Sequence, residues 1–276
     1  VLYIPTPLIL LSALTSIRII KGYAITLRQK HHFQKTKYPI IQITEMMTHH
    51  NIICQLQAYG TEEKRQKLMY FFKTGKSQYG EGDQFLGVTV PEIRKVAKVN
   101  KDVSMEVLEQ LLYSEWHEVR LCALLILVLQ FEKADEAHRQ TLVEFYLAHT
   151  SQINNWDLVD LSAYYILGTY LLDKSHERLY QLAKSPLLWD NRIAIVSTYA
   201  FIRKGDLDDT YALSTQLMHH PHDLMHKAVG WMLREAGKKD GERLYKYIDK
   251  YRKEMPRTML RYAIERLTPE ARAHYR

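Results

Sequence analysis

A motif of about fourteen residues recurs along this 276-residue chain, and it limits the chain to a repetitive helical architecture. Each copy has a turn, a Trp or polar residue, a charged residue about one turn later, and then an apolar helical stretch that contains alanine. The copies begin at Ser114, Asn154, Leu187, His222 and Glu254, so they are 40, 33, 35 and 32 residues apart. Spacings of this size are typical of two-helix repeats of the HEAT type, in which each pair buries its inner face against the next. We therefore predict an all-α fold, a HEAT-like helical-repeat solenoid.

The composition supports a helical chain in a reducing compartment. Eleven Gly and eight Pro are few for this length, which disfavours a turn-rich all-β fold. The apolar run Leu121–Phe131 is too long for a strand, and only Phe85–Val90, ended by Pro91, resembles one. Two cysteines, Cys54 and Cys122, exclude a disulfide framework and a cysteine-rich metal site.

The first 45 residues differ from the rest of the chain. The opening stretch is apolar but has no basic residue before Arg18, so it lacks the basic start of a signal peptide. It contains prolines and is short for a membrane span. Because the first methionines are Met46 and Met47, we expect residues 1–45 to be an over-extended reading frame and residues 46–276 to form a single repeat domain. A membrane-anchoring segment is the alternative for residues 1–45.

The net charge of +7 is unevenly distributed. Residues 46–226 carry 18 basic and 23 acidic side chains, a net charge of −5, whereas residues 227–276 carry 14 basic and 7 acidic side chains, a net charge of +7. A basic C-terminal region can attract a phosphate backbone, because binding releases the counterions of the nucleic acid. Solvated helix faces explain the same charge equally well.

The charged position of the motif holds mostly cations. It is occupied in order by Arg120, Asp160, Arg192, Lys227 and either Arg257 or Arg261. In a helical solenoid these side chains repeat along one face, the concave one.

Each of the four tryptophans lies one helical turn from one of these charged residues. Trp156 precedes Asp160 by four residues, and Trp231 follows Lys227 by four, so each pair shares a helix face. Trp116 and Trp189 are best explained as packing anchors between repeats. Asp160 is the acid among the cations, and it either faces a groove or forms a structural ion pair with Arg192.

Other polar residues have simpler explanations. Asp157 and Asp190 each follow a tryptophan and favour a helix N-terminus through the macrodipole. Five histidines (His117, His219, His220, His222 and His226) have spacings that match no metal-binding pattern, so we expect neither a metal nor another cofactor.

Five segments together resemble the DNA alkylation repair family, the AlkD-like alkylpurine DNA glycosylases built from HEAT-like repeats. They are FLGVTVPEIRKVAK (85–98), SEWHEVRLCALLILV (114–128), NNWDLVDLSA (154–163), HKAVGWMLREAG (226–237) and MPRTMLRYAIERL (255–267). The resemblance covers roughly residues 50–270 and implies that the chain cradles duplex DNA and hydrolyses N3- or N7-alkylated purines from deoxyribose.

The resemblance also assigns roles to individual residues. It implies that Asp160 is the catalytic carboxylate, that Trp156 and Trp231 line the same pocket, and that Arg192 holds the DNA backbone nearby. The match of Arg192 is the loosest, because family members often have two adjacent basic residues at that position. We further expect a cytoplasmic monomer. The alternative is a catalytically inactive HEAT-repeat scaffold that binds nucleic acid or a protein partner.

Candidate contacts to the DNA backbone are the basic residues of the motif helices and of the C-terminal region. They are Arg120, Lys227, Arg234, Lys238, Lys239, Arg243, Arg257 and Arg261.

Overall fold

The computed structural model describes residues 38–275 of the chain. The compact unit Glu45–Arg276 holds every predicted site residue. Most of the expected N-terminal extension, residues 1–45, lies outside the described residues; its last part begins helix α2 (Tyr38–Gln57). No helix among the described residues is both long and apolar enough to cross a membrane.

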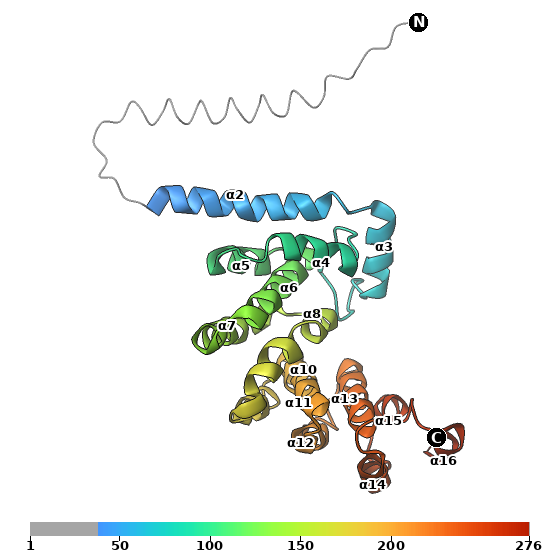
Figure 1. Cartoon of the computed structure of the whole chain (residues 1–276). Coiled ribbons are helices and arrows are strands. Elements are labelled where there is room, and N and C mark those ends of the chain that lie inside the picture. The colour runs from blue at the N-terminus through green and yellow to red at the C-terminus, as the bar shows by residue number, and fades with distance from the viewer. Residues whose placement is uncertain (1–37, 276) are drawn as a thin grey trace, which may run out of the picture. The chain divides into compact units, whose positions relative to one another are not determined.

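Helices make up nearly all of the regular structure in the described part (Figure 1). The five copies of the recurring motif fall on what we call the motif helices: α6 (His117–Lys133), α8 (Trp156–Asp160), α10 (Leu188–Ser197), α13 (Asp223–Gly237) and α15 (Arg257–Ala263). The intervening helices are α5 (Met105–Leu112), α7 (Glu136–Ala148), α9 (Glu177–Leu182), α12 (Asp208–Gln216) and α14 (Gly241–Tyr251). The remaining elements are α3 (Glu62–Phe71), α4 (Val90–Val99), η1 (Thr150–Gln152), η2 (Tyr164–Gly168), η3 (Leu171–Asp173), α11 (Tyr199–Lys204) and α16 (Pro269–Tyr275).

The motif helices pack against one another in chain order. Helix α6 contacts α8, α8 contacts α10, α10 contacts α13, and α13 contacts α15. Intervening helices pack beside them, as α5 and α7 do against α6 and as α12 and α14 do against α13. The prediction of an all-α helical-repeat fold is therefore confirmed, and the sequence period is the spacing of the motif helices.

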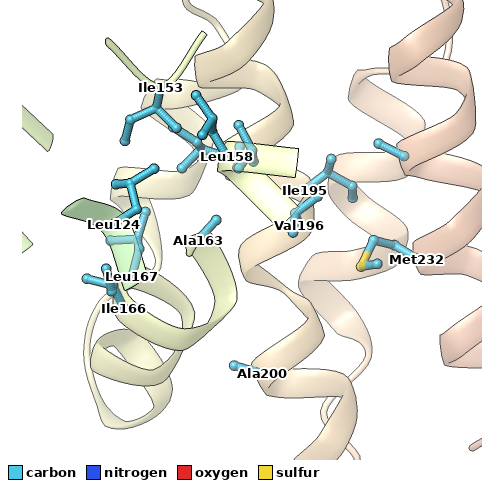
Figure 2. Close-up of a cluster of buried hydrophobic side chains, with 14 of the residues drawn as sticks. Leu124, Ile153, Leu158, Ala163, Ile166, Leu167, Ile195, Val196, Ala200 and Met232 are labelled. Atoms are coloured by element: carbon cyan, nitrogen blue, oxygen red, sulfur yellow. The ribbon is translucent and has the colours of Figure 1, made fainter. Parts of the chain in front are cut away.

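One buried cluster joins consecutive motif helices (Figure 2). Leu124 of α6, Leu158 of α8, Ile195 of α10 and Met232 of α13 are all fully buried. Packing of these apolar side chains explains why the repeats must stack, because the inner face of each helix pair has no other apolar surface to cover it. The cluster fixes α8, α10 and α13 relative to one another, and these helices carry the candidate site.

Side-chain caps set where several helices begin. Ser104, Asp135 and Asp240 each accept a hydrogen bond from the backbone N–H three residues later. Thr89 and Glu92 form a reciprocal capping box at the start of α4, with a Thr89 N–H to Glu92 carboxylate distance of 2.8 Å. Such caps satisfy backbone groups that the helix itself leaves unpaired.

The strand-like reading of Phe85–Val90 is wrong. The segment forms no strand: the structure has only an isolated bridge just before it, between Gln84 and Trp116. Helix α4 already begins at Val90, the last residue of the segment. The Glu118 carboxylate accepts hydrogen bonds from the backbone N–H groups of Leu86, Gly87 and Val88 at 2.8–3.1 Å. A buried carboxylate thus replaces the partner strand that the extended backbone would otherwise need.

Candidate active site

A hollow of about 600 Å³ opens beside α8, α10 and α13. It brings together Asp160, Arg192 and Lys227, three of the charged positions of the recurring motif. We call it the Asp160 hollow, and it is lined by Tyr70, Phe71, Lys73, Tyr79, Trp156, Asp160, Arg192, Leu224, Lys227, Trp231, Arg234 and Tyr262. The residues predicted as catalytic, Asp160, Trp156, Trp231 and Arg192, therefore all reach one place.

Asp160 lies at the end of the short helix α8, whose start is fixed by the residue before it. The N–H of Trp156 donates to the side-chain oxygen of Asn155 at 2.8 Å, which begins the helix. One turn later the Asp160 side chain retains 16% of its surface exposed. The carboxylate is thus neither sealed in the core nor on an open surface, and its exposed part faces the hollow.

Arg192 holds the Asp160 carboxylate with two parallel hydrogen bonds. Its Nε donates to Oδ1 at 2.9 Å and its Nη2 donates to Oδ2 at 2.8 Å. Its Nη1 donates to the carbonyl oxygen of Leu224 at 2.7 Å. Because only 5% of the Arg192 side chain is exposed, the guanidinium orients the carboxylate and offers little surface to a DNA phosphate. The Asp160–Arg192 ion pair that the sequence analysis offered as an alternative is therefore present, and both residues line the hollow.

Burial raises the pKa of the Asp160 carboxyl above its ordinary value. The charge and hydrogen bonds of Arg192 oppose this rise, and the neighbouring Asp157 carboxylate adds to it. A carboxylate with a raised pKa accepts a proton more readily near neutral pH than an ordinary aspartate does. Each carboxylate oxygen also keeps a lone pair beyond the one that Arg192 uses, so a water molecule can donate to it.

Two tryptophans, Trp156 and Trp231, line the hollow together with Asp160. Trp156 stacks on Phe72, with ring centroids 5.2 Å apart and an interplanar angle of 19°. Trp231 lies on α13, packed against the core and 6.1 Å from the ring of Tyr199. Trp116 and Trp189 are also partly buried against the core and do not line the hollow, as expected of packing anchors.

A buried network of charges fastens the loop before α4 to the motif helices. His117 Nδ1 lies 2.8 Å from an Asp83 oxygen, and its Nε2 lies 2.8 Å from an Asp157 oxygen. Arg120 Nη2 donates to the other Asp83 oxygen at 2.6 Å. We call these four residues the His117 clasp. Asp157, which the sequence assigned to helix N-terminus stabilisation, lies in the first turn of α8 and also holds this histidine.

The His117 clasp predicts that stability falls in mildly alkaline solution. Burial alone lowers the pKa of His117, but Asp157 and Asp83 outweigh it and raise the pKa to about 9. This contribution to the free energy of unfolding is complete below pH 6.5, about the pKa of histidine in the unfolded chain. It is lost as pH rises through about 9, and the total loss is about 3 kcal/mol. Denaturant unfolding at pH 6 to 10 measures it. In the His117→Gln variant the fall between pH 6.5 and 9 should disappear, and an unchanged fall would contradict the assignment.

The clasp removes Arg120 from the candidate DNA contacts. Its side chain is 5% exposed, and besides Asp83 it donates to the carbonyl oxygens of Ser114 and Glu115 at 3.0 and 3.3 Å. Arg120 therefore does not line the hollow, although it occupies the same motif position as Asp160 and Arg192. It ties α6 to the loop instead.

Two of the remaining candidate cations belong to the hollow, and we call them the rim cations. Lys227 and Arg234 line the Asp160 hollow; Lys227 pairs with Asp223 at 2.9 Å, and Arg234 pairs with Glu235 and Glu265.

Further candidate cations lie elsewhere in the C-terminal part of the chain, and Lys238 and Lys239 lie in the turn between α13 and α14. Lys239 is exposed, and Lys238 is half-exposed and pairs with Glu235. Arg257 and Arg261 line a second hollow of about 360 Å³, together with Arg272. Arg243 pairs with Asp208 at 2.7 Å.

Sequence reasoning missed one wall of the Asp160 hollow. Tyr70 and Phe71 at the end of α3, with Lys73 and Tyr79 of the following loop, line it from a part of the chain that precedes the recurring motif. Tyr262 of α15 was also missed. The signal available in the sequence was the Tyr-Phe-Phe run at 70–72. Three consecutive aromatic residues cover more than one face of a helix end, which indicates contacts on more than one side.

Within residues 38–275, no cluster of three His, Cys, Asp or Glu side chains has a geometry that would hold a metal ion.

Comparison with known proteins identifies relatives by sequence model and by fold. The family model described as "DNA alkylation repair enzyme" matches residues 52–267. Among solved structures, the chain is similar to "Predicted DNA alkylation repair enzyme from Enterococcus faecalis", with a TM-score of 0.60 and 16% sequence identity over 76% of this chain and 97% of that one. No curated protein matches the chain.

Proposed function

The chain belongs to the DNA alkylation repair enzyme family, and from this premise we propose that it hydrolyses the N-glycosidic bond of cationic N3- or N7-alkylated purines in duplex DNA. One observation carries the proposal: a single carboxylate, Asp160, is accessible in a hollow that two tryptophans and several cations also line. A positively charged base on a polyanionic backbone complements such a hollow.

The sparse chemistry of the site suits a substrate that is already activated. Alkylation at N3 or N7 makes the purine cationic, so when the C1′–N9 bond breaks its electron pair neutralises the departing base. No general acid is needed to protonate the leaving group, in contrast to the paired carboxylates of ordinary glycoside hydrolysis. The site must stabilise an oxocarbenium-like sugar and deliver water to C1′.

Asp160 supplies both effects in this proposal. Its negative charge stabilises the developing positive charge on the sugar, and one carboxylate oxygen accepts the proton that the attacking water loses. Arg192 keeps the carboxylate in one orientation before the reaction begins, so little reorganisation accompanies bond cleavage. The raised pKa of Asp160 makes it a suitable proton acceptor.

The tryptophans and the rim cations bind different parts of the substrate. Trp156 and Trp231 present aromatic faces that attract a cation, at about 0.5–2 kcal/mol each. Our proposed set of phosphate contacts consists of Lys227 and Arg234, which line the hollow, Lys238 and Lys239 in the turn after α13, and Arg257 and Arg261 of α15. Such contacts fix the position of the duplex and carry no sequence information.

Binding of undamaged duplex DNA should depend steeply on salt, and Lys239→Ala and Arg261→Ala should each lower the slope of log K against log salt by about one. Each variant removes one exposed cation from the proposed contact set. Fluorescence anisotropy titrations at several salt concentrations measure the slope. The control is Lys133→Ala, which removes an exposed lysine at the far end of α6. An unchanged slope in both test variants would remove these residues from the interface.

The proposal is tested by comparing the release of methylated bases that carry a positive charge with the release of one that is neutral. DNA carrying 7-methylguanine or 3-methyladenine should release free base when incubated with the protein, and DNA carrying O6-methylguanine should not, because that base is neutral. Chromatography of the freed bases measures both. Release of the neutral adduct at a comparable rate would contradict the mechanism.

We further propose that the protein acts as a monomer in the cytoplasm, without a metal or other cofactor. A cationic purine leaves without Lewis-acid assistance, so the reaction itself calls for none.

A further inference from the structure

Tyr70 and Phe71, which we call the aromatic lip, are unusually exposed for large apolar side chains. Tyr70 retains 79% and Phe71 retains 59% of its surface exposed. They are adjacent at the C-terminal end of α3, and both line the Asp160 hollow. Exposed apolar surface gathered at the edge of a concavity is typical of a binding site.

The aromatic lip lies next to the proposed catalytic group. The Phe71 ring contacts Trp156 edge to face, with ring centroids 5.7 Å apart and an interplanar angle of 73°. Trp156 lies one helical turn before Asp160 and faces the same hollow. Phe71 therefore extends the aromatic wall that begins at Trp156, and Trp231 belongs to another helix of the same hollow.

The backbone that carries the lip is held in place. Phe72 is buried and stacks between Phe85 and Trp156, with centroid distances of 5.1 and 5.2 Å. The Tyr79 hydroxyl donates to the carbonyl oxygen of Phe71 at 3.5 Å. A side chain at Gly80 would collide with the carbonyl oxygen of Phe72, so the loop can approach α3 only with glycine there.

The His117 clasp secures the other end of the same loop. Asp83 is tied to His117 and Arg120 of α6, and through His117 to Asp157 of α8. Asp157 is adjacent to Trp156, so the clasp connects the lip's loop directly to the helix that carries Asp160. An exposed aromatic pair held this firmly is preorganised for a ligand, and its ordering costs little when the ligand binds.

We infer that Phe71, flanked by Tyr70, contacts the damaged base itself and makes the site prefer a cationic purine over a neutral one. This inference rests on the proposed function. A phenyl ring offers no hydrogen bond, so it cannot distinguish base sequence, but its negative face attracts a positively charged ring. Phe71 thereby determines specificity: Asp160 acts on the sugar while the lip holds the base.

The inference is tested by equilibrium binding of a duplex that cannot be cleaved. The probe contains 7-methylguanine on a 2′-fluorinated sugar, which resists loss of the base, and the reference duplex has guanine at that position. The quantity measured is the preference, the ratio of the reference dissociation constant to that of the probe. Phe71→Ala should lower the preference about tenfold, in the range found when one base-stacking aromatic is removed. Affinity for the reference duplex should stay within about twofold.

Further variants separate stacking from simple packing. Phe71→Trp should keep the preference, because the ring is retained, and Phe71→Leu should lose it, because only apolar volume is retained. The matched control is Tyr113→Ala, since Tyr113 is 60% exposed and does not line the hollow. Because Phe71 is itself mostly exposed, its truncation leaves the core intact.

The outcomes are distinguishable. A wild-type protein that binds both duplexes equally but releases 7-methylguanine from a cleavable duplex overturns the contact and leaves the proposed function standing. A wild-type protein that releases no base from the cleavable duplex overturns the proposed function. A wild-type protein that prefers the probe while Phe71→Ala or Phe71→Leu keeps the full preference overturns the contact alone.

Discussion

Replacing Asp160 with asparagine should lower the rate of 7-methylguanine release from duplex DNA by a factor of about 100 or more. The variant keeps the size of the side chain and one of the two hydrogen bonds from Arg192, but it removes the negative charge and the proton acceptor. Because the hollow and its aromatic walls stay in place, affinity for duplex DNA with an abasic-site analogue should remain within about threefold. Single-turnover excision and equilibrium binding measure the two quantities separately.

The control for this variant is Asp190→Asn. Asp190 is likewise an aspartate of a motif helix and largely buried, but it accepts a hydrogen bond from Ser185 and does not line the hollow. Excision by this control should be close to that of the wild type. If Asp160→Asn excises as fast as the control, Asp160 is not the catalytic group.

Replacing Arg192 with methionine should lower the free energy of unfolding by about 3–5 kcal/mol, because it leaves the largely buried Asp160 carboxylate without its counter-ion. The same change should raise the pKa of Asp160 further, since it removes the guanidinium that opposes the effect of burial in the wild-type protein. Excision by the variant should therefore be weakest at acidic and neutral pH and should recover as pH rises. Denaturant unfolding and a pH series of single-turnover rates measure the two effects.

The double variant Asp160→Asn, Arg192→Met separates the structural role of the ion pair from its chemical role. Removing both charges should restore most of the lost stability, because no buried charge is left alone. Excision should stay as low as in Asp160→Asn. A stable double variant that excised normally would assign the ion pair to packing between the repeats and nothing more.

The helical repeat and the centre of the site were predictable because both depend on short-range spacing. The motif period gives the spacing of the motif helices, and in the structure each motif helix contacts the next. Trp156 and Asp160 are one turn apart on one helix, so their meeting required no knowledge of tertiary structure. Asp160 and Arg192 occupy equivalent motif positions on adjacent helices, which brought them together.

The parts that could not be predicted depend on long-range contacts. Arg120 occupies the same motif position as Arg192 and is equally buried, yet it does not line the hollow, because Asp83 in a distant loop binds it. Tyr70 and Phe71 reach the hollow only because the His117 clasp and Gly80 fold that loop against α3 and α8. No local period encodes such contacts, since Asp83, Tyr70 and Phe71 precede the first copy of the recurring motif.

The most direct measurement uses the wild-type protein and a duplex that carries a single 7-methylguanine in a labelled strand. We expect free 7-methylguanine and an equal amount of abasic strand, which alkali then cleaves at that one position, with no cleavage before alkali is added. Retention of the modified base on the strand, while the protein binds the duplex at the same concentrations, would contradict the enzymatic account and leave a DNA-binding scaffold.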